Sequence, residues 1–121
     1  MGSSVLRVPP TPSSWSDTGD TQLLKLIRRV TERMNPLEIW LFGSRAEGRA
    51  RPDSDYDLLV VMPDSTPEAQ LDPVRAWRLG REVGVVADII PCLRSEFDEE
   101  KFESDTLAQA AYRRGWKVYE R

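Results

Sequence analysis

A chain of 121 residues with 40% hydrophobic and 31% charged residues has the size and composition of one folded domain. It contains no histidine, which excludes Ser-His-Asp and Cys-His catalysis, histidine general bases and the common zinc sites. The net charge of −3 disfavours broad binding of nucleic acid by charge alone, and no apolar run approaches the ~20 residues of a membrane span.

The two ends of the chain differ in composition. Residues 1–18 are rich in Ser, Thr and Pro and predict a flexible arm, whereas residues 19–121 predict a single domain. The start of the chain lacks the basic and apolar regions of a signal peptide. Cys92 is the only cysteine and cannot form an internal disulfide, so we expect a buried thiol and a cytoplasmic protein.

The first regular element is a helix. Apolar residues at helical spacing predict it over residues 21–34, and Asn35-Pro36 ends it. The stripe expected to face the core consists of Leu23, Leu24, Ile27, Val30 and Met34.

Three apolar runs bounded by turn residues predict strands over residues 37–42, 58–62 and 83–91. The second run is apolar at every position, which indicates a strand covered on both faces. Between the second and third strands, residues 70–82 predict a crossover helix, which makes these two strands parallel. We expect its apolar residues to pack on the sheet: Leu71, Val74, Trp77 and Leu79.

The C-terminal part adds smaller elements. Residues 94–105 are acidic and predict an amphipathic surface helix, although a segment that faces a partner is an alternative. Ser104 or Asp105 is expected to cap a last helix, Gly115 to end it, and residues 116–119 to form a short strand. The expected fold is α/β (α+β): a small mixed sheet of three or more strands with helices packed on it, one helix before the strands and the crossovers on one face.

The most informative motif lies between the first two strands. Gly43-Ser44 follows the first strand, and Asp55 and Asp57 come at the start of the second. Alternation along a strand places the two carboxylates on the same side, about 6.6 to 6.8 Å apart. A small-residue turn before the helix-compatible residues 45–47 can aim backbone N–H groups at an anion. If the turn and the Asp pair share one site, the first two strands are antiparallel.

Asp88 is the one charge in the third apolar run. Parallel pairing of the second and third strands would bring it level with Asp55 and Asp57. Three carboxylates on one sheet face suit hard divalent cations such as magnesium. An edge-strand charge that discourages aggregation is the alternative explanation of Asp88.

Two other motifs match poorly. Residues 43–50 approach a P-loop, but Arg49 and Ala50 replace the required lysine and hydroxyl residue. The aspartates at 53, 55 and 57 have the first spacings of a calcium loop, but Leu58 replaces its glycine.

The combination of LFGSRAEGRARPDSDYDLLVV with the later VADIIP resembles the nucleotidyltransferase superfamily of DNA polymerase β, particularly its minimal stand-alone (MNT) domains. The resemblance implies that Gly43 and Ser44 hold the β- and γ-phosphates of ATP. It also implies that Asp55 and Asp57 bind two magnesium ions, and that Asp88 binds the catalytic ion and helps to deprotonate the acceptor hydroxyl. On charge grounds, Arg45, Arg49 and Arg51 are further phosphate candidates, with solvated loop cations as the alternative.

Minimal domains of this family are often the antitoxin of an all-helical HEPN-type toxin. The resemblance therefore implies transfer of AMP from ATP to a hydroxyl group on such a partner. One alternative is a binding module that neutralises the partner by occlusion without catalysis. A third possibility is transfer to a small molecule or an RNA end, although larger relatives that do this carry a further substrate-binding domain.

Overall fold

The structure is a computed structural model and describes residues 20–51 and 54–121. The arm predicted over residues 1–18 lies outside the described residues. No helix within the described ranges combines the length and apolar character that crossing a membrane requires.

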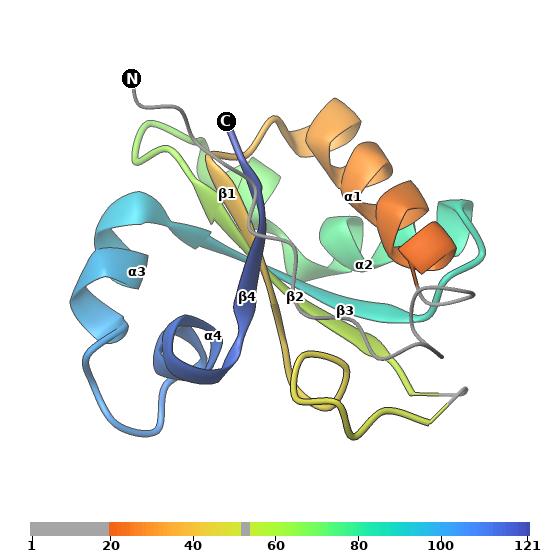
Figure 1. The fold of residues 1–121 in the computed structure, drawn as a ribbon. Coiled ribbons are helices and arrows are strands. Elements are labelled where there is room, and N and C mark those ends of the chain that lie inside the picture. Colours follow the sequence, from red (N-terminus) through yellow and green to blue (C-terminus); the bar gives the residue numbers. More distant parts are fainter. Residues whose placement is uncertain (1–19, 52–53) are drawn as a thin grey trace.

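Four strands form one mixed sheet in the order β3-β2-β1-β4 (Figure 1). They are β1 (Glu38–Phe42), β2 (Tyr56–Met62), β3 (Ala87–Leu93) and β4 (Trp116–Glu120). Strand β1 is antiparallel to both of its neighbours, and β3 is parallel to β2. Both predicted strand directions are confirmed.

Helices cover both faces of the sheet, and the predicted crossover helix lies on the same face as the first helix. Figure 1 shows α1 (Asp20–Met34) and α2 (Pro73–Glu82) on one side, and α3 (Arg94–Glu100) and α4 (Leu107–Arg114) on the other. A short 3-10 helix, η2 (Glu68–Leu71), precedes α2. The reason lies in β2, because its side chains are apolar and buried on both faces and each face needs a cover.

Helix α1 packs with a stripe that is rotated slightly from the predicted one. Leu23, Leu26 and Val30 are buried, whereas Leu24 is 60% exposed. The helix ends at Met34, as predicted, and Asn35 follows with a φ of 50°. The period of 3.6 residues allows Leu24 or Leu26 to share a face with Leu23 and Val30, and only contact with the sheet decides between them.

Helix α2 does not use all of its apolar residues to cover the sheet. Ala76, Leu79 and Gly80 face the core, whereas Val74 and Trp77 are 55% and 42% exposed. A Cβ atom at Gly80 would lie 2.7 Å from the Val85 carbonyl oxygen. The small residues let the helix lie close to the chain that leads into β3, and this close contact turns the larger side chains outward.

Strand β3 begins and ends later than predicted. Residues 83–86 leave α2 through Gly84, whose φ is +73°, and the strand then continues through Pro91 to Leu93. Proline has no N–H to donate to a neighbouring strand, but β3 is an edge strand, where this loss is tolerated.

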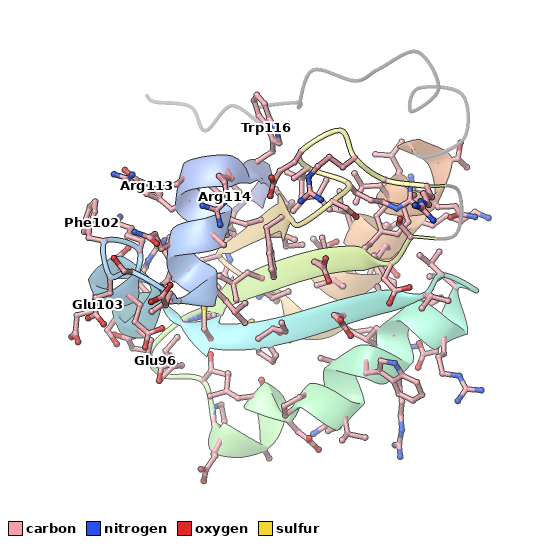
Figure 2. All side chains as sticks on the ribbon, turned by 90° about the horizontal axis from the view of Figure 1, so that it is seen from below. Glu96, Phe102, Glu103, Arg113, Arg114 and Trp116 are labelled. Atoms are coloured by element: carbon pink, nitrogen blue, oxygen red, sulfur yellow. The ribbon has the colours of Figure 1, made fainter. Side chains whose placement is uncertain are left out.

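The acidic segment after β3 is only partly helical, since α3 ends at Glu100. The cap of α4 is Thr106, whose hydroxyl accepts from the Gln109 N–H at 3.0 Å, rather than Ser104 or Asp105. Phe102 and Glu103 project from the loop between α3 and α4 (Figure 2). Helix α4 ends before Gly115 and leads into β4, as predicted.

Candidate active site

The centre of the site is a pair of carboxylates on neighbouring strands. Asp57 of β2 and Asp88 of β3 are direct partners in the parallel register. Asp88 is exposed and Asp57 is half-buried. The predicted strand arrangement therefore brings together two of the three candidate carboxylates.

The pKa of Asp57 is raised above its ordinary value. Burial is the largest cause, followed by the negative charges of Asp88 and Asp55 and by a hydrogen bond with Asp88. Two carboxylates can share such a bond only when one of them carries a proton. The pair thus concentrates negative charge that a proton or a cation must compensate.

Asp55 lies close enough for its charge to act on Asp57, but it is exposed to solvent. In the part of the chain that the structure describes, no group of three or more His, Cys, Asp or Glu side chains is gathered closely enough to hold a metal ion. Magnesium prefers one or two carboxylates together with phosphate oxygens. The Asp57–Asp88 pair fits this donor set, and metal binding by Asp55 stays a prediction.

The turn after β1 lies directly against Asp57. Gly43 has a φ of +79°, and a Cβ atom on it would lie 2.3 Å from the Asp57 Oδ2. The expected helix start is not formed: residues 44–48 make turns, in which the Gly43 carbonyl accepts from the N–H groups of Ala46 and Glu47. Glycine is therefore required here for two reasons, the backbone conformation and the space beside the carboxylate.

Arg45 is buried beneath the loop that joins β1 to β2. Its Nε and Nη2 donate to the Ser54 carbonyl at 3.0 and 2.7 Å, and its guanidinium lies 4.1 Å from the centre of the Tyr56 ring. Only 8% of the residue is exposed. The solvated-cation alternative is wrong for Arg45, because this side chain fixes the loop, and phosphate binding by it stays a prediction.

The remaining candidates lie on the surface of the same loop. Arg49 is exposed and forms an ion pair of 3.3 Å with Glu47, and Arg51 is also exposed. Ser44 is half-buried beside Gly43. The structure places all of the predicted phosphate candidates in the loop that precedes Asp55, although it leaves their roles as predictions.

The sequence over residues 23–113 matches the nucleotidyltransferase domain family. The chain belongs to this family. The match spans α1, the strands β1 to β3 and α4, and it includes every candidate site residue. Nucleotidyl transfer is therefore the class of reaction of this domain.

Solved structures show the same nucleotidyltransferase fold at low sequence identity. A protein from Sulfolobus solfataricus, provisionally named a nucleotidyltransferase, has a TM-score of 0.58 and 17% identity, covering 93% of this chain and 91% of that one. A toxin–antitoxin structure with AMP-PNP has a TM-score of 0.55 and 19% identity, covering 84% and 73% of the two chains. An MntA–HpeT toxin–antitoxin variant has a TM-score of 0.53 and 17% identity, with the same coverage. No curated protein sequence matches the chain.

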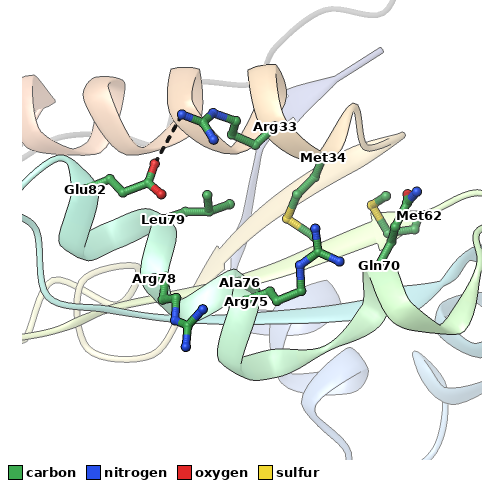
Figure 3. Close-up of a pocket in the computed structure, with 9 residues that line it drawn as sticks. All are labelled: Arg33, Met34, Met62, Gln70, Arg75, Ala76, Arg78, Leu79 and Glu82. Carbon is green, nitrogen blue, oxygen red and sulfur yellow. Dashed lines mark ion pairs between the residues drawn. The ribbon is translucent and has the colours of Figure 1, made fainter.

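A cavity lies away from the candidate active site. It has a volume of about 350 Å³ and lies between α1, η2 and α2, with Met62 at the far end of β2 among its lining residues (Figure 3). Arg33, Arg75 and Arg78 surround it, and Arg33 pairs with Glu82 at 3.6 Å. None of the candidate site residues lines this cavity, so its size alone does not make it the active site.

Two features of the site were not recognisable from the sequence. The first is that Arg45 fixes the loop, which depends on its contacts with Ser54 and Tyr56, nine and eleven positions along the chain. The second is the exposure of Val74 and Trp77, which depends on how α2 packs against the sheet. The three arginines at 45, 49 and 51 are the only local sequence signal for a charged loop. That signal does not show which arginine is buried and which are exposed.

Proposed function

We propose that this nucleotidyltransferase domain transfers AMP from ATP to a hydroxyl group of a partner protein, as an antitoxin-type adenylyltransferase that uses magnesium. The observation that carries the proposal is the Asp57–Asp88 pair against the Gly43 turn. The pair has no structural benefit, since adjacent carboxylates repel each other and Asp57 is half-buried. A site that binds cations and phosphate explains why the chain tolerates this cost.

In the proposed reaction, the turn beside Asp57 binds the nucleotide and Asp88 activates the acceptor. Gly43 and Ser44 hold the β- and γ-phosphates of ATP, with Arg49 as a further phosphate ligand. Asp88 accepts the proton of the acceptor hydroxyl, whose oxygen forms a bond to the α-phosphorus. The bond from that phosphorus to the bridging oxygen breaks, and pyrophosphate leaves. Magnesium bound by Asp55, Asp57 and Asp88 would neutralise the phosphate charge and orient the triphosphate.

The toxin–antitoxin neighbours support the choice of a protein acceptor. One of them was solved with the ATP analogue AMP-PNP. Another is a variant in which two aspartates, two positions apart, are replaced by glutamate. The same spacing separates Asp55 from Asp57. At 17 to 19% identity these structures share the fold with this chain, so the substrate is our proposal.

Labelled ATP tests the proposal directly. The purified chain, magnesium, ATP labelled at the α-phosphate and the protein encoded beside this chain are incubated together, and label on that protein is measured. We expect transfer, and a loss of at least 100-fold in Asp57→Asn and Asp88→Asn. Glu99→Gln removes an exposed carboxylate of α3 and should transfer normally. Label transfer that persists in both Asp variants would overturn the assignment of the site.

A non-catalytic antitoxin that occludes its partner is the second candidate. It would be favoured if Asp57→Asn and Asp88→Asn still neutralised the partner in cells while transferring no label. Transfer to a small molecule or an RNA end ranks third, because the toxin–antitoxin neighbours favour a protein acceptor.

A further inference from the structure

The cavity between α1, η2 and α2 combines an apolar floor with a positively charged rim (Figure 3). Its floor contains Met62 and Leu79, which are buried, and Met34, which is half-buried. The charged residues of its lining are Arg33, Arg75, Arg78 and Glu82. Three guanidinium groups and one carboxylate leave the lining with an excess of two positive charges.

The one carboxylate of the lining is already occupied. Glu82 pairs with Arg33 at 3.6 Å and also with Arg29, which lies outside the lining. Within the described ranges, Arg75 and Arg78 form no ion pair, and Arg75 donates to a backbone carbonyl of η2 at 3.3 Å. The rim therefore holds two guanidinium groups whose charge is not compensated by the described part of the chain.

The opposite pattern occurs in the acidic loop, residues 102–105, which joins α3 to α4. All four of its residues are exposed. Phe102 is 69% exposed, the highest value among the large hydrophobic residues that the structure describes. Neither Glu103 nor Asp105 forms an ion pair with a described residue. The acidic loop thus presents one apolar ring and two negative charges.

The two surfaces match in charge and in chemistry. The acidic loop carries two negative charges and the cavity an excess of two positive ones. Arginine can hold a carboxylate through two parallel hydrogen bonds. The ring of Phe102 suits a floor that contains methionine, whose thioether makes favourable contacts with aromatic rings. Another partner would have to present this combination, whereas a second copy of this chain already carries it.

The arrangement of the fold directs this contact to a neighbouring copy. The cavity lies with α1 and α2 on one face of the sheet, and the acidic loop joins the helices on the other face (Figure 1). The sheet separates the acidic loop from the cavity of its own copy. We propose that the acidic loop of one copy docks in the cavity of the next, so that the chain associates head to tail. Such contacts build rings or open filaments rather than two-fold dimers.

The contact is weak and reversible. Four loop residues bury less surface than the about 800 Å² per partner of a stable interface. Pairs of exposed charges are also screened by salt. We therefore expect the average mass of the protein to rise with protein concentration at low ionic strength and to fall toward the monomer in high salt.

Sedimentation velocity of the full chain over a range of concentrations measures the association. Arg75→Glu reverses a rim charge in the first turn of α2, where an acidic residue favours the helix. Glu103→Arg reverses a charge of the acidic loop, and Phe102→Ser removes its ring without a change of charge. Each of the three variants should associate at least tenfold more weakly than the wild type.

Lys25→Glu is the matched control. Lys25 is exposed on α1 and does not line the cavity, and its replacement changes the net charge as Arg75→Glu does. This variant should associate like the wild type. Circular dichroism and thermal unfolding check that every variant folds.

An equimolar mixture of Arg75→Glu and Glu103→Arg tests the pairing itself. In the mixture, the reversed loop meets the reversed rim, and the unchanged loop of one variant meets the unchanged rim of the other. The mixture should associate like the wild type, although each variant alone stays close to monomeric. Restored association would also show that both variants are folded.

A wild type that stays monomeric at every concentration and salt overturns the proposal. A mixture of folded variants that stays monomeric overturns it too, as does Lys25→Glu if it weakens association as much as Arg75→Glu. If the wild type is monomeric and Arg75→Glu abolishes binding of the protein encoded beside this chain, the cavity belongs to that partner instead. The association requires neither ATP nor magnesium, so a failure of label transfer leaves it standing.

Discussion

At the scale of single residues, Gly43 has the most demanding environment of the candidate site. Its positive φ disfavours any side chain, and its Cα–H side faces Asp57 at a distance that excludes a Cβ atom. A glycine before a serine is unremarkable in a sequence. In the fold, it lets the backbone of the turn after β1 touch the Asp57 carboxylate.

Alanine at Gly43 and at Gly48 should separate the effect of backbone strain from the effect of a clash with Asp57. Gly48 in the same loop has a similar φ of +74° but open space where a Cβ atom would lie. Both variants should lose about 1 to 2 kcal/mol of stability from backbone strain. Only Gly43→Ala displaces Asp57, so its nucleotidyl transfer should fall at least 100-fold, whereas Gly48→Ala stays within a few fold of wild type. Thermal unfolding and the labelled-ATP assay measure the two effects. Equal activities would mean that the contact with Asp57 is unimportant.

At the scale of elements, two charged side chains connect parts that are distant in sequence. Glu38 of β1 is 8% exposed and binds Arg94 at the start of α3 at 3.0 Å, while Lys117 of β4 lies 3.7 Å away. Arg45 joins the loop after β1 to the start of β2. The first contact connects the sheet to the helices on one face, and the second shapes the approach to the carboxylates.

Glu38 should make the stability depend on acid pH. Burial would raise its pKa, but hydrogen bonds from Arg94 and Trp40 and the charges of Arg94 and Lys117 outweigh burial and lower it below 4.5. A lowered pKa in the folded state gives stability that is present above pH 4.5 and is lost as the pH falls through the folded-state pKa. Glu38→Gln should cost about 1 to 2 kcal/mol at pH 7, and the difference from wild type should shrink at pH 3. Urea unfolding at both pH values measures it, and a difference that grows at pH 3 would contradict this explanation.

Arg45 and Arg49 lie in one loop and should behave differently. Arg45→Ala leaves the Ser54 carbonyl without this donor and removes the contact with the Tyr56 ring, so we expect a loss of about 1 to 3 kcal/mol of stability. Arg49→Ala removes only an exposed ion pair and should stay within about 0.5 kcal/mol of wild type. Thermal unfolding compares the stability of the two variants. Equal losses would show that the buried contacts of Arg45 do not fix the loop.

At the scale of the whole molecule, the active site opposes the stability of the fold. Asp57 has a raised pKa, so its contribution to stability is greatest below pH 3.8 and is lost as the pH rises through the folded-state pKa. At pH 7 the folded protein therefore carries a cost that arises from burial and from Asp88 and Asp55. A domain that kept these residues only for structure would gain by losing them.

Asp57→Asn should therefore be inactive and more stable than wild type when divalent cations are removed by chelation. We expect the Tm to rise by about 2 to 5 °C. Magnesium should raise the Tm of the wild type and have little effect on Asp57→Asn, because binding to the folded state alone stabilises it. Differential scanning calorimetry with and without magnesium measures both shifts. A lower Tm in Asp57→Asn without cations would mean that the charge of Asp57 supports the fold.

Much of this fold was predictable from local sequence patterns. The apolar run at 58–62 gave the buried strand. The assumption that the Gly43 turn and the Asp pair share one site gave the antiparallel direction, and the crossover helix before the third strand gave the parallel one. The start of β3 was placed too early, because Val83 and Val85 are as apolar as strand residues although the chain is still leaving α2. The outward position of Trp77 was also missed, since periodicity cannot show which of two apolar faces meets the sheet.

The sequence by itself determined the family and its class of chemistry, and it indicated the residues that we propose to carry it. The absence of histidine and the pattern of a small-residue turn, paired aspartates and a third aspartate on an apolar strand depend only on residue type and spacing. The tertiary structure alone decided that Asp57 and Asp88 form the close pair, that Arg45 is buried, and that a cavity rimmed by arginines lies between α1 and α2. The physical reason is that these features depend on contacts between segments far apart in the chain, and such contacts are set by packing.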